Sequence, residues 1–174
     1  MPVKRELWRE PLAKNYTPSW HCPSCSGGYL NIVPDSLQYI ETHESKKAHD
    51  HPAWDPDWIV FRFSALLKCQ NNNCEEAVSV AGKGRVEMVQ TSHSGDLDYI
   101  EFFYPEFVSP SPDLFQIPDE CPDEILSEIQ QAFIAVWCDY ASAATRIRAS
   151  IERLLDHLKE PKTKINVTIQ LILP

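Results

Sequence analysis

The chain has 174 residues, 43% of them hydrophobic, and its 16 Lys and Arg against 25 Asp and Glu give a net charge of −9. This length predicts one compact domain or a small module joined to a second, and the apolar content excludes a wholly disordered chain. The negative balance disfavours a general affinity for the phosphate backbone of nucleic acids.

The location that we expect is the cytoplasm. The opening stretch MPVKRELWREPLAKN scatters its charges and lacks the apolar run of a secretory signal. The longest apolar stretches, at 134–137 and 169–173, are much shorter than the roughly 20 residues that cross a bilayer, so we expect no membrane segment. In a reducing compartment, paired cysteines hold metal or do chemistry more often than they form structural disulfides.

Two pairs of cysteines carry the clearest chemical signal. The first pair is Cys22-Pro-Ser-Cys25, and the second is Cys69 and Cys74, separated by Gln and three Asn. Short turns of this kind direct two sulfurs toward one ion, and four thiolates complete the tetrahedron of a structural zinc site. The spacing therefore predicts Zn²⁺ as a structural cofactor bound by Cys22, Cys25, Cys69 and Cys74.

Two other readings of these cysteines remain open. They could be thiols without metal in a small apolar core, or the first pair could be a redox motif. The redox reading is the weaker one, because two glycines and a β-rich run follow Cys25 where a redox motif would need the N-terminus of a helix.

The runs that flank the cysteine pairs have the composition of strands. They lie at 29–33, 58–67 and 77–81, and a Gly-Lys-Gly turn at 82–84 is expected to lead to a further strand at about 85–89. Strand, turn and strand around each pair predict an antiparallel sheet of the zinc-ribbon type.

A polar segment at about 35–57 interrupts this pattern and contains His43, His49 and His51. We expect an inserted loop or hairpin tip here, because Pro52 and Pro56 argue against a helix. Whether the three histidines bind a second metal stays open.

The second half of the chain has a helical pattern. After a β-rich run at 99–104, a proline-rich connector is expected at 105–121, and Pro122 is suited to the first position of a helix. Apolar residues then recur at helical spacing in two stripes, with Asp139 as a candidate N-cap between them. The predicted fold is α+β: a zinc-ribbon-like module at 1–104, the connector, and two main helices with a tail at 122–174. Cys121 and Cys138 fall outside the zinc pattern and are expected to be ordinary thiols.

Several of these motifs together resemble a known family. They are the Trp20-His-Cys-Pro-Ser-Cys opening, the second cysteine pair, the proline-rich approach, Pro122-x-x-Ile125 and Ala143-Ala-x-Arg146-x-Arg148-x-x-Ile151-Glu152-x-Leu154-Leu155. Over about residues 5–160 the chain is similar to the domain-of-unknown-function family numbered 4145. The resemblance implies a HEPN-like helical domain after the ribbon and a bacterial setting near phage-defence genes. The chain would be a short or truncated member, because the strand-like run at 165–173 stands where further helices are expected.

HEPN ribonucleases have an Arg and a His with four to six residues between them, so that the His moves a proton while the Arg stabilises charge on the phosphate. The nearest candidates are Arg153 and His157, which have only three residues between them and leave catalysis in doubt. Basic residues that could contact nucleic acid cluster on the same predicted helix, as Arg146, Arg148 and Arg153.

Three functions follow as hypotheses. The leading one is a zinc-stabilised, non-enzymatic interaction protein whose helical half contacts a second copy or another protein. The alternatives are a dimeric, metal-independent ribonuclease of the HEPN type and a zinc ribbon that binds nucleic acid.

Overall fold

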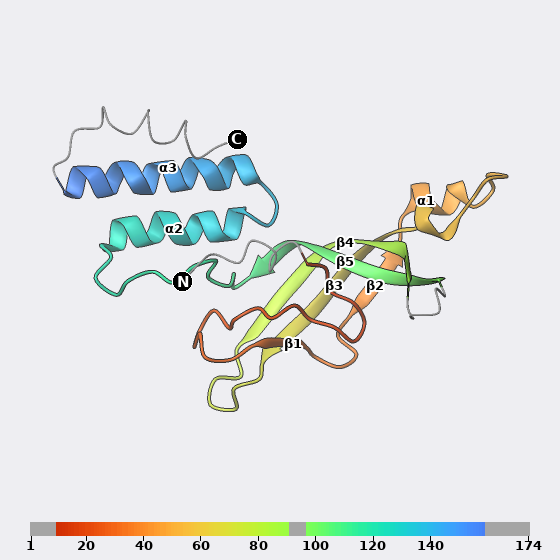
Figure 1. The fold of residues 1–174 in the computed structure, drawn as a ribbon, viewed down its shortest axis with the longest axis horizontal. Helices are drawn as coiled ribbons and strands as arrows, with labels where there is room; N and C mark the ends of the chain where they lie inside the picture. The colour runs from red at the N-terminus through yellow and green to blue at the C-terminus, as the bar shows by residue number, and fades with distance from the viewer. Residues whose placement is uncertain (1–9, 91–96, 159–174) are drawn as a thin grey trace. The chain divides into compact units, whose positions relative to one another are not determined.

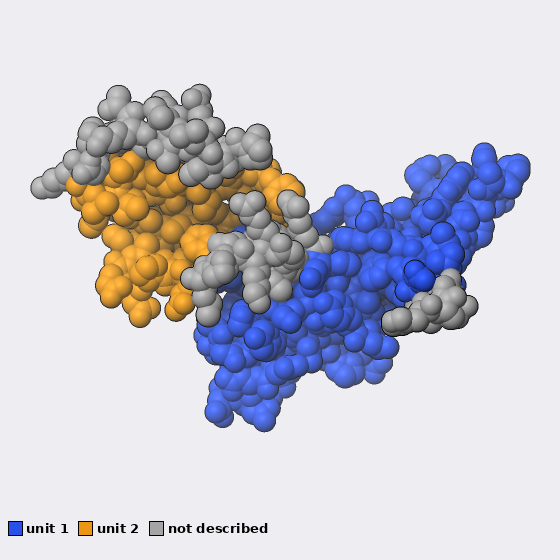
Figure 2. Space-filling view, in the orientation of Figure 1, with its two compact units in different colours: residues 1–114 blue, residues 115–174 orange. Residues whose placement is uncertain are grey.

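The fold is described from a computed structural model, over residues 10–90 and 97–158. The chain divides into two compact units, residues 1–114 and 115–174, which are taken separately below (Figure 2). The elements in chain order are β1 (Leu30–Ile32), β2 (Gln38–Glu41), α1 (His43–Ala48), a 3₁₀ turn (Pro56–Trp58), β3 (Val60–Cys69), β4 (Ala77–Gln90), β5 (Leu97–Ser109), α2 (Asp123–Ala135) and α3 (Tyr140–His157).

The first unit is built on one antiparallel sheet in the order β1-β3-β4-β5, with β2 also paired to β3 (Figure 1). Burial alternates along β3, where Phe63, Ala65, Leu67 and Cys69 are buried and the residues between them are exposed. This period of two places one face of the sheet in the core. The mixed α+β class and the antiparallel sheet predicted from the sequence are confirmed.

The core lies on the face that carries Phe103 of β5, which is fully buried. The rings of Tyr39, Phe61 and Phe63 lie 5.0, 6.4 and 5.2 Å from the Phe103 ring. The N-terminal segment closes over the same place, because Leu12 exchanges two backbone hydrogen bonds of 2.8 Å with Phe103. Residues at both ends of the unit therefore meet in one apolar cluster.

The predicted turn at 82–84 is wrong, since β4 runs without a break from Ala77 to Gln90. Glycine at position 82 allows β5 to approach β4 closely. A Cβ on Gly82 would lie 2.2 Å from the carbonyl oxygen of Tyr104. The register between β4 and β5 shifts between Ala81 and Gly82, and Pro105 pairs with Gly82 there. A proline, which has no N–H to donate, is tolerated in a strand at such an irregularity. Strand β5 therefore continues through Pro105 to Ser109 and is longer than the predicted run at 99–104.

The segment predicted as a loop at 35–57 contains strand β2 and a short helix, so the expectation of no helix there is wrong. Helix α1 starts at an N-cap, Thr42, whose hydroxyl accepts a hydrogen bond from the Ser45 N–H. Pro52 follows the helix and Pro56 opens the 3₁₀ turn, so neither proline interrupts α1. At the base, Thr42 N–H donates to the Val60 carbonyl at 2.8 Å, which holds the two ends of the insertion together.

The second unit is a hairpin of α2 and α3, and the two predicted helices are confirmed. The sequence predicts Pro122 at the first helical position of α2, whereas in the structure Pro122 is the N-cap and the helix begins at Asp123. Asp139 caps α3 by accepting hydrogen bonds from the N–H groups of Ala141 and Ser142. Across the hairpin, Glu128 pairs with both Arg146 and Arg153. The strand-like run predicted at 165–173 lies outside the described residues.

In the part of the chain that the structure describes, no helix combines the length and the apolar character needed to span a bilayer.

Candidate metal centre

The two cysteine turns meet because of the register between β1 and β3. Leu30 of β1 pairs with Cys69 at the end of β3, and the Gln70 N–H donates to the Tyr29 carbonyl at 2.9 Å. The first turn leads into β1 and the second leaves β3, so this pairing places the turns beside each other.

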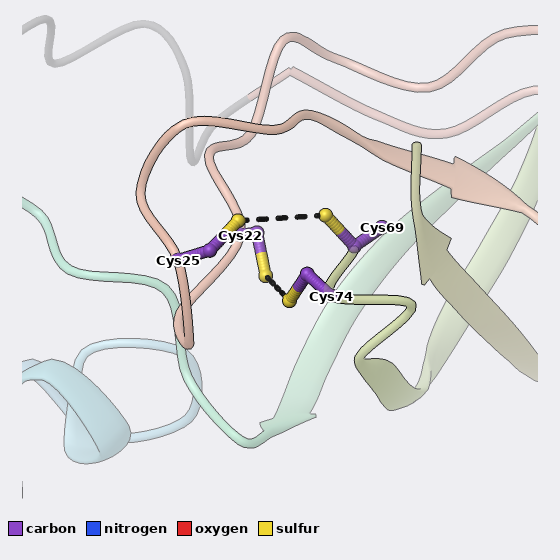
Figure 3. A group of neighbouring side chains, drawn as sticks. All are labelled: Cys22, Cys25, Cys69 and Cys74. Carbon is purple, nitrogen blue, oxygen red and sulfur yellow. Dashed lines mark hydrogen bonds between the residues drawn. The ribbon is translucent and has the colours of Figure 1, made fainter. Parts of the chain in front are cut away.

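The four cysteine sulfurs form one cluster (Figure 3). Cys22 Sγ lies 3.7 Å from Cys74 Sγ, and Cys25 Sγ lies 3.7 Å from Cys69 Sγ. All four sulfurs lie within 4.8 Å of one another. Four sulfurs placed about 2.3 Å from a central zinc in a tetrahedron would be about 3.8 Å apart. The cluster is therefore close to the size that a tetrahedral metal requires, and the sequence prediction that these residues gather is confirmed.

One sulfur of each pair also receives a backbone N–H from the residue two positions further along. The Ser24 N–H donates to Cys22 Sγ and the Asn71 N–H to Cys69 Sγ, both at 3.4 Å. At the other two cysteines, the backbone N–H groups of Gly27 and Glu76 act to lower the pKa of Cys25 and of Cys74. Such donors stabilise negative charge on sulfur, so the two turns are built alike as sites for thiolates.

The thiols differ in pKa. Burial raises the pKa of Cys25, but hydrogen bonds from the Gly27 N–H and from neighbouring cysteines outweigh burial and lower the pKa to about 6. Burial raises the pKa of Cys69 to about 12, although the Asn71 N–H acts in the opposite direction. One sulfur thus ionises readily while another holds its proton, and a cation at the centre would be needed to draw out the remaining protons.

Polar contacts join the two turns at their rim. Asn71 Nδ2 donates to Cys25 Sγ at 3.7 Å, and the Ser24 hydroxyl donates to the Glu76 carboxylate. Gly28 fits between the turns because it has no side chain: a Cβ there would lie 2.5 Å from Cys69 Sγ. Close approach of the two turns thus requires glycine at this position.

The histidines of the insertion are used locally. His49 Nε2 lies 2.8 Å from Glu41 Oε1, and His51 Nδ1 accepts the Ala53 N–H at 3.1 Å. Within residues 10–90 and 97–158, the four cysteines are the one group of three or more His, Cys, Asp or Glu that gathers at metal-binding distances. The structure does not bring His43, His49 and His51 together as a second metal site.

The candidate catalytic and nucleic-acid residues lie on α3. Arg153 Nη2 lies 2.9 Å from Glu128 Oε1, and Arg146 Nη1 lies 3.0 Å from Glu128 Oε2. Both cations therefore hold α3 against α2. Arg148 and His157 are exposed, with His157 at the last position of the helix.

Sequence reasoning missed the residues that serve the sulfurs without being ligands. Asn71 supplies its backbone N–H to Cys69 and its side-chain amide to Cys25, and Glu76 binds Ser24 across the turns. Backbone donors leave no signature in residue type, so residue types alone do not indicate which N–H groups reach the sulfurs. Cys121 and Cys138 lie outside the cluster, as predicted.

A family described as "Domain of unknown function (DUF8608)" matches residues 10–108, which is 99 of the 174 residues. The matched segment holds all four cysteines and ends before α2. No curated protein and no solved structure gives a match to the chain.

Proposed function

The chain belongs to the DUF8608 family, and we propose that its cysteine cluster binds one Zn²⁺ that stabilises the sheet for a role in protein interaction. The observation that carries this proposal is the set of four sulfurs within 4.8 Å of one another, with one sulfur of each pair accepting a backbone N–H. A small core of thiols without metal would have no use for such donors, because a neutral thiol accepts hydrogen bonds only weakly. The donor set thus favours thiolates, and thiolates in contact require a cation.

The metal would be structural. Tetrahedral sites of four sulfurs bind zinc or iron, and four protein ligands leave no open position for water or substrate. The cluster joins two turns that are far apart in the sequence, so an ion there would fix the end of the sheet where β1 meets β3. This role fits a protein that presents surfaces to a partner.

The interaction role has its support in the second unit. Two helices expose Ile134, Tyr140, Leu154 and Leu158 as large apolar side chains. Exposed apolar residues of this kind on adjacent helices are typical of contact surfaces. We propose that this unit mediates contact with a second copy or another protein.

The ribonuclease alternative loses support from the ion pairs of Arg153, whose guanidinium is bound to carboxylates of α2. A phosphate would have to displace these carboxylates. The resemblance to family 4145, the HEPN-like character and the defence setting stay predictions from the sequence.

The zinc proposal is tested by metal analysis of the purified full chain. We expect about one zinc per chain, and loss of zinc on Cys22→Ser or Cys69→Ser. Cys121→Ser is the matched control, because it removes a thiol outside the cluster. A folded wild type that takes up no zinc after addition of the metal would contradict the proposal, and bound iron with its visible absorbance would replace zinc as the metal.

A further inference from the structure

Helix α3 carries an apolar stripe with the spacing of a coiled coil. The stripe residues follow one another at intervals of four, three, four, three and four, as a and d positions do in heptads. Much of the stripe is exposed: Tyr140 is 67% accessible, Leu158 58% and Leu154 40%. We call this set the α3 stripe, and its members are Tyr140, Ala144, Ile147, Ile151, Leu154 and Leu158.

The α3 stripe is not the side of the helix that packs on α2. That side holds Ala143 and Ser150, which are buried, and it is bordered by Arg146 and Arg153, which pair with Glu128 of α2. At 100° per residue, Ala143 and Ser150 lie about a quarter of a turn from the centre of the stripe. The hairpin thus uses one side of α3 and leaves a second apolar side exposed.

We propose that the α3 stripe binds the α3 stripe of a second copy of this chain in an antiparallel, two-fold arrangement. In antiparallel coiled coils each a position meets a d position of the other helix. One two-fold axis, at the level of residue 149, satisfies this rule for the whole stripe, because the residue numbers of each contacting pair average to 149. Tyr140 then meets Leu158, Ile147 meets Ile151, and the small Ala144 meets the large Leu154.

Charge at the border of the stripe fits the same arrangement. Arg148 and Glu152 lie one helical turn apart on the side of α3 turned away from Ala143 and Ser150, and neither forms an ion pair within the described residues. Across the two-fold axis, Arg148 of one copy lies level with a point two residues, or about 3 Å, from Glu152 of the partner subunit. The long Arg148 side chain spans this offset, and the same holds for the reverse pair. A second copy therefore offers both the apolar surface and the opposite charges that this side of α3 requires.

This inference deepens the interaction role proposed above and does not depend on zinc. Light scattering and sedimentation of the full chain over a range of concentrations should give a dimer. Leu154→Glu and Leu158→Glu, both at exposed positions, should weaken dimerisation by more than about tenfold, because each places a carboxylate in an apolar contact. Met88→Glu, a similarly exposed apolar residue on β4 of the first unit, is the matched control and should leave the dimer unchanged.

The charged pair tests the arrangement itself. Arg148→Glu should weaken the dimer, and the double variant R148E/E152R should restore it. A wild type that stays monomeric at every concentration overturns self-association through α3. A dimer that is insensitive to Leu154→Glu and Leu158→Glu also overturns the proposal, while leaving an interaction role through another surface in place. Zinc content measured on the same variants tests the metal proposal separately, since none of these substitutions touches the cysteine cluster.

Discussion

Replacing Gly28 by alanine should weaken zinc binding sharply. The added Cβ would lie 2.5 Å from Cys69 Sγ and 3.1 Å from the Cβ of Asn71. Ordinary contacts begin at about 3.5 Å, so one cysteine turn must move by about 1 Å to admit the methyl group. Overpacking of this kind costs about 1–3 kcal/mol, which corresponds to roughly 5- to 150-fold in affinity. Competition against a coloured zinc chelator measures this loss directly.

Gly27 is the matched control for this experiment. It is the adjacent residue in the same turn, and a Cβ there would meet only the Cys25 carbonyl oxygen, at an ordinary 3.5 Å. Neither glycine has a φ in the left-handed region, so alanine brings no backbone strain at either position. Both substitutions restrict the unfolded chain equally, and their difference isolates the contact with Cys69. Equal zinc affinities for Gly27→Ala and Gly28→Ala would refute the placement of the two turns.

Three further predictions concern the first unit. Phe103→Ala should lower the free energy of unfolding by about 3–5 kcal/mol in denaturant titrations, because the fully buried ring sits at the centre of the core, and a loss below about 1 kcal/mol would contradict this. Gly82→Ala should destabilise the sheet in the same assay, because its Cβ would overlap the Tyr104 carbonyl oxygen; unchanged stability would show that the strands are further apart. The hydrogen bond from the Ser45 hydroxyl lowers the pKa of Glu41 in the folded protein. The ionised Glu41 should therefore stabilise α1 at pH values above about 4.3, the pKa of Glu in an unfolded chain. This stabilisation should be lost as the pH falls through the lower pKa of Glu41 in the folded protein. The NMR signal of the Ser45 amide, recorded against pH, follows that transition. If the same transition persists in Glu41→Gln, Glu41 is excluded as its cause.

The sequence predicted the four cysteines of the cluster better than their surroundings. Closely spaced cysteine pairs are typical of metal sites, so spacing alone indicated that Cys22, Cys25, Cys69 and Cys74 would gather. The donors to sulfur are main-chain groups, whose positions depend on the path of each turn. Neither that path nor the pairing of Leu30 with Cys69 can be read from residue types.

The errors in the predicted elements have local causes. Gly-Lys-Gly is typical of turns, but in β4 Gly82 makes room for the backbone of β5, a reason that lies in another strand. Pro52 and Pro56 were weighed against a helix in the insertion, yet α1 is short enough to end before both of them. In the second unit, the helical period and the Asp139 cap are local signals, so both helices could be predicted.

The backbone hydrogen bond between Thr42 and Val60 gives the insertion a consequence for protein engineering. The segment from α1 to the 3₁₀ turn leaves and rejoins the sheet at one point, and the contacts of Ser45 with Glu41, Trp58 and Val60 stay within it or at its base. Closing a loop twice as long costs only about 0.6 kcal/mol more. The sheet should therefore accept a foreign peptide or a small reporter domain in place of α1 while the cysteine turns, at the opposite end of β3, keep their geometry.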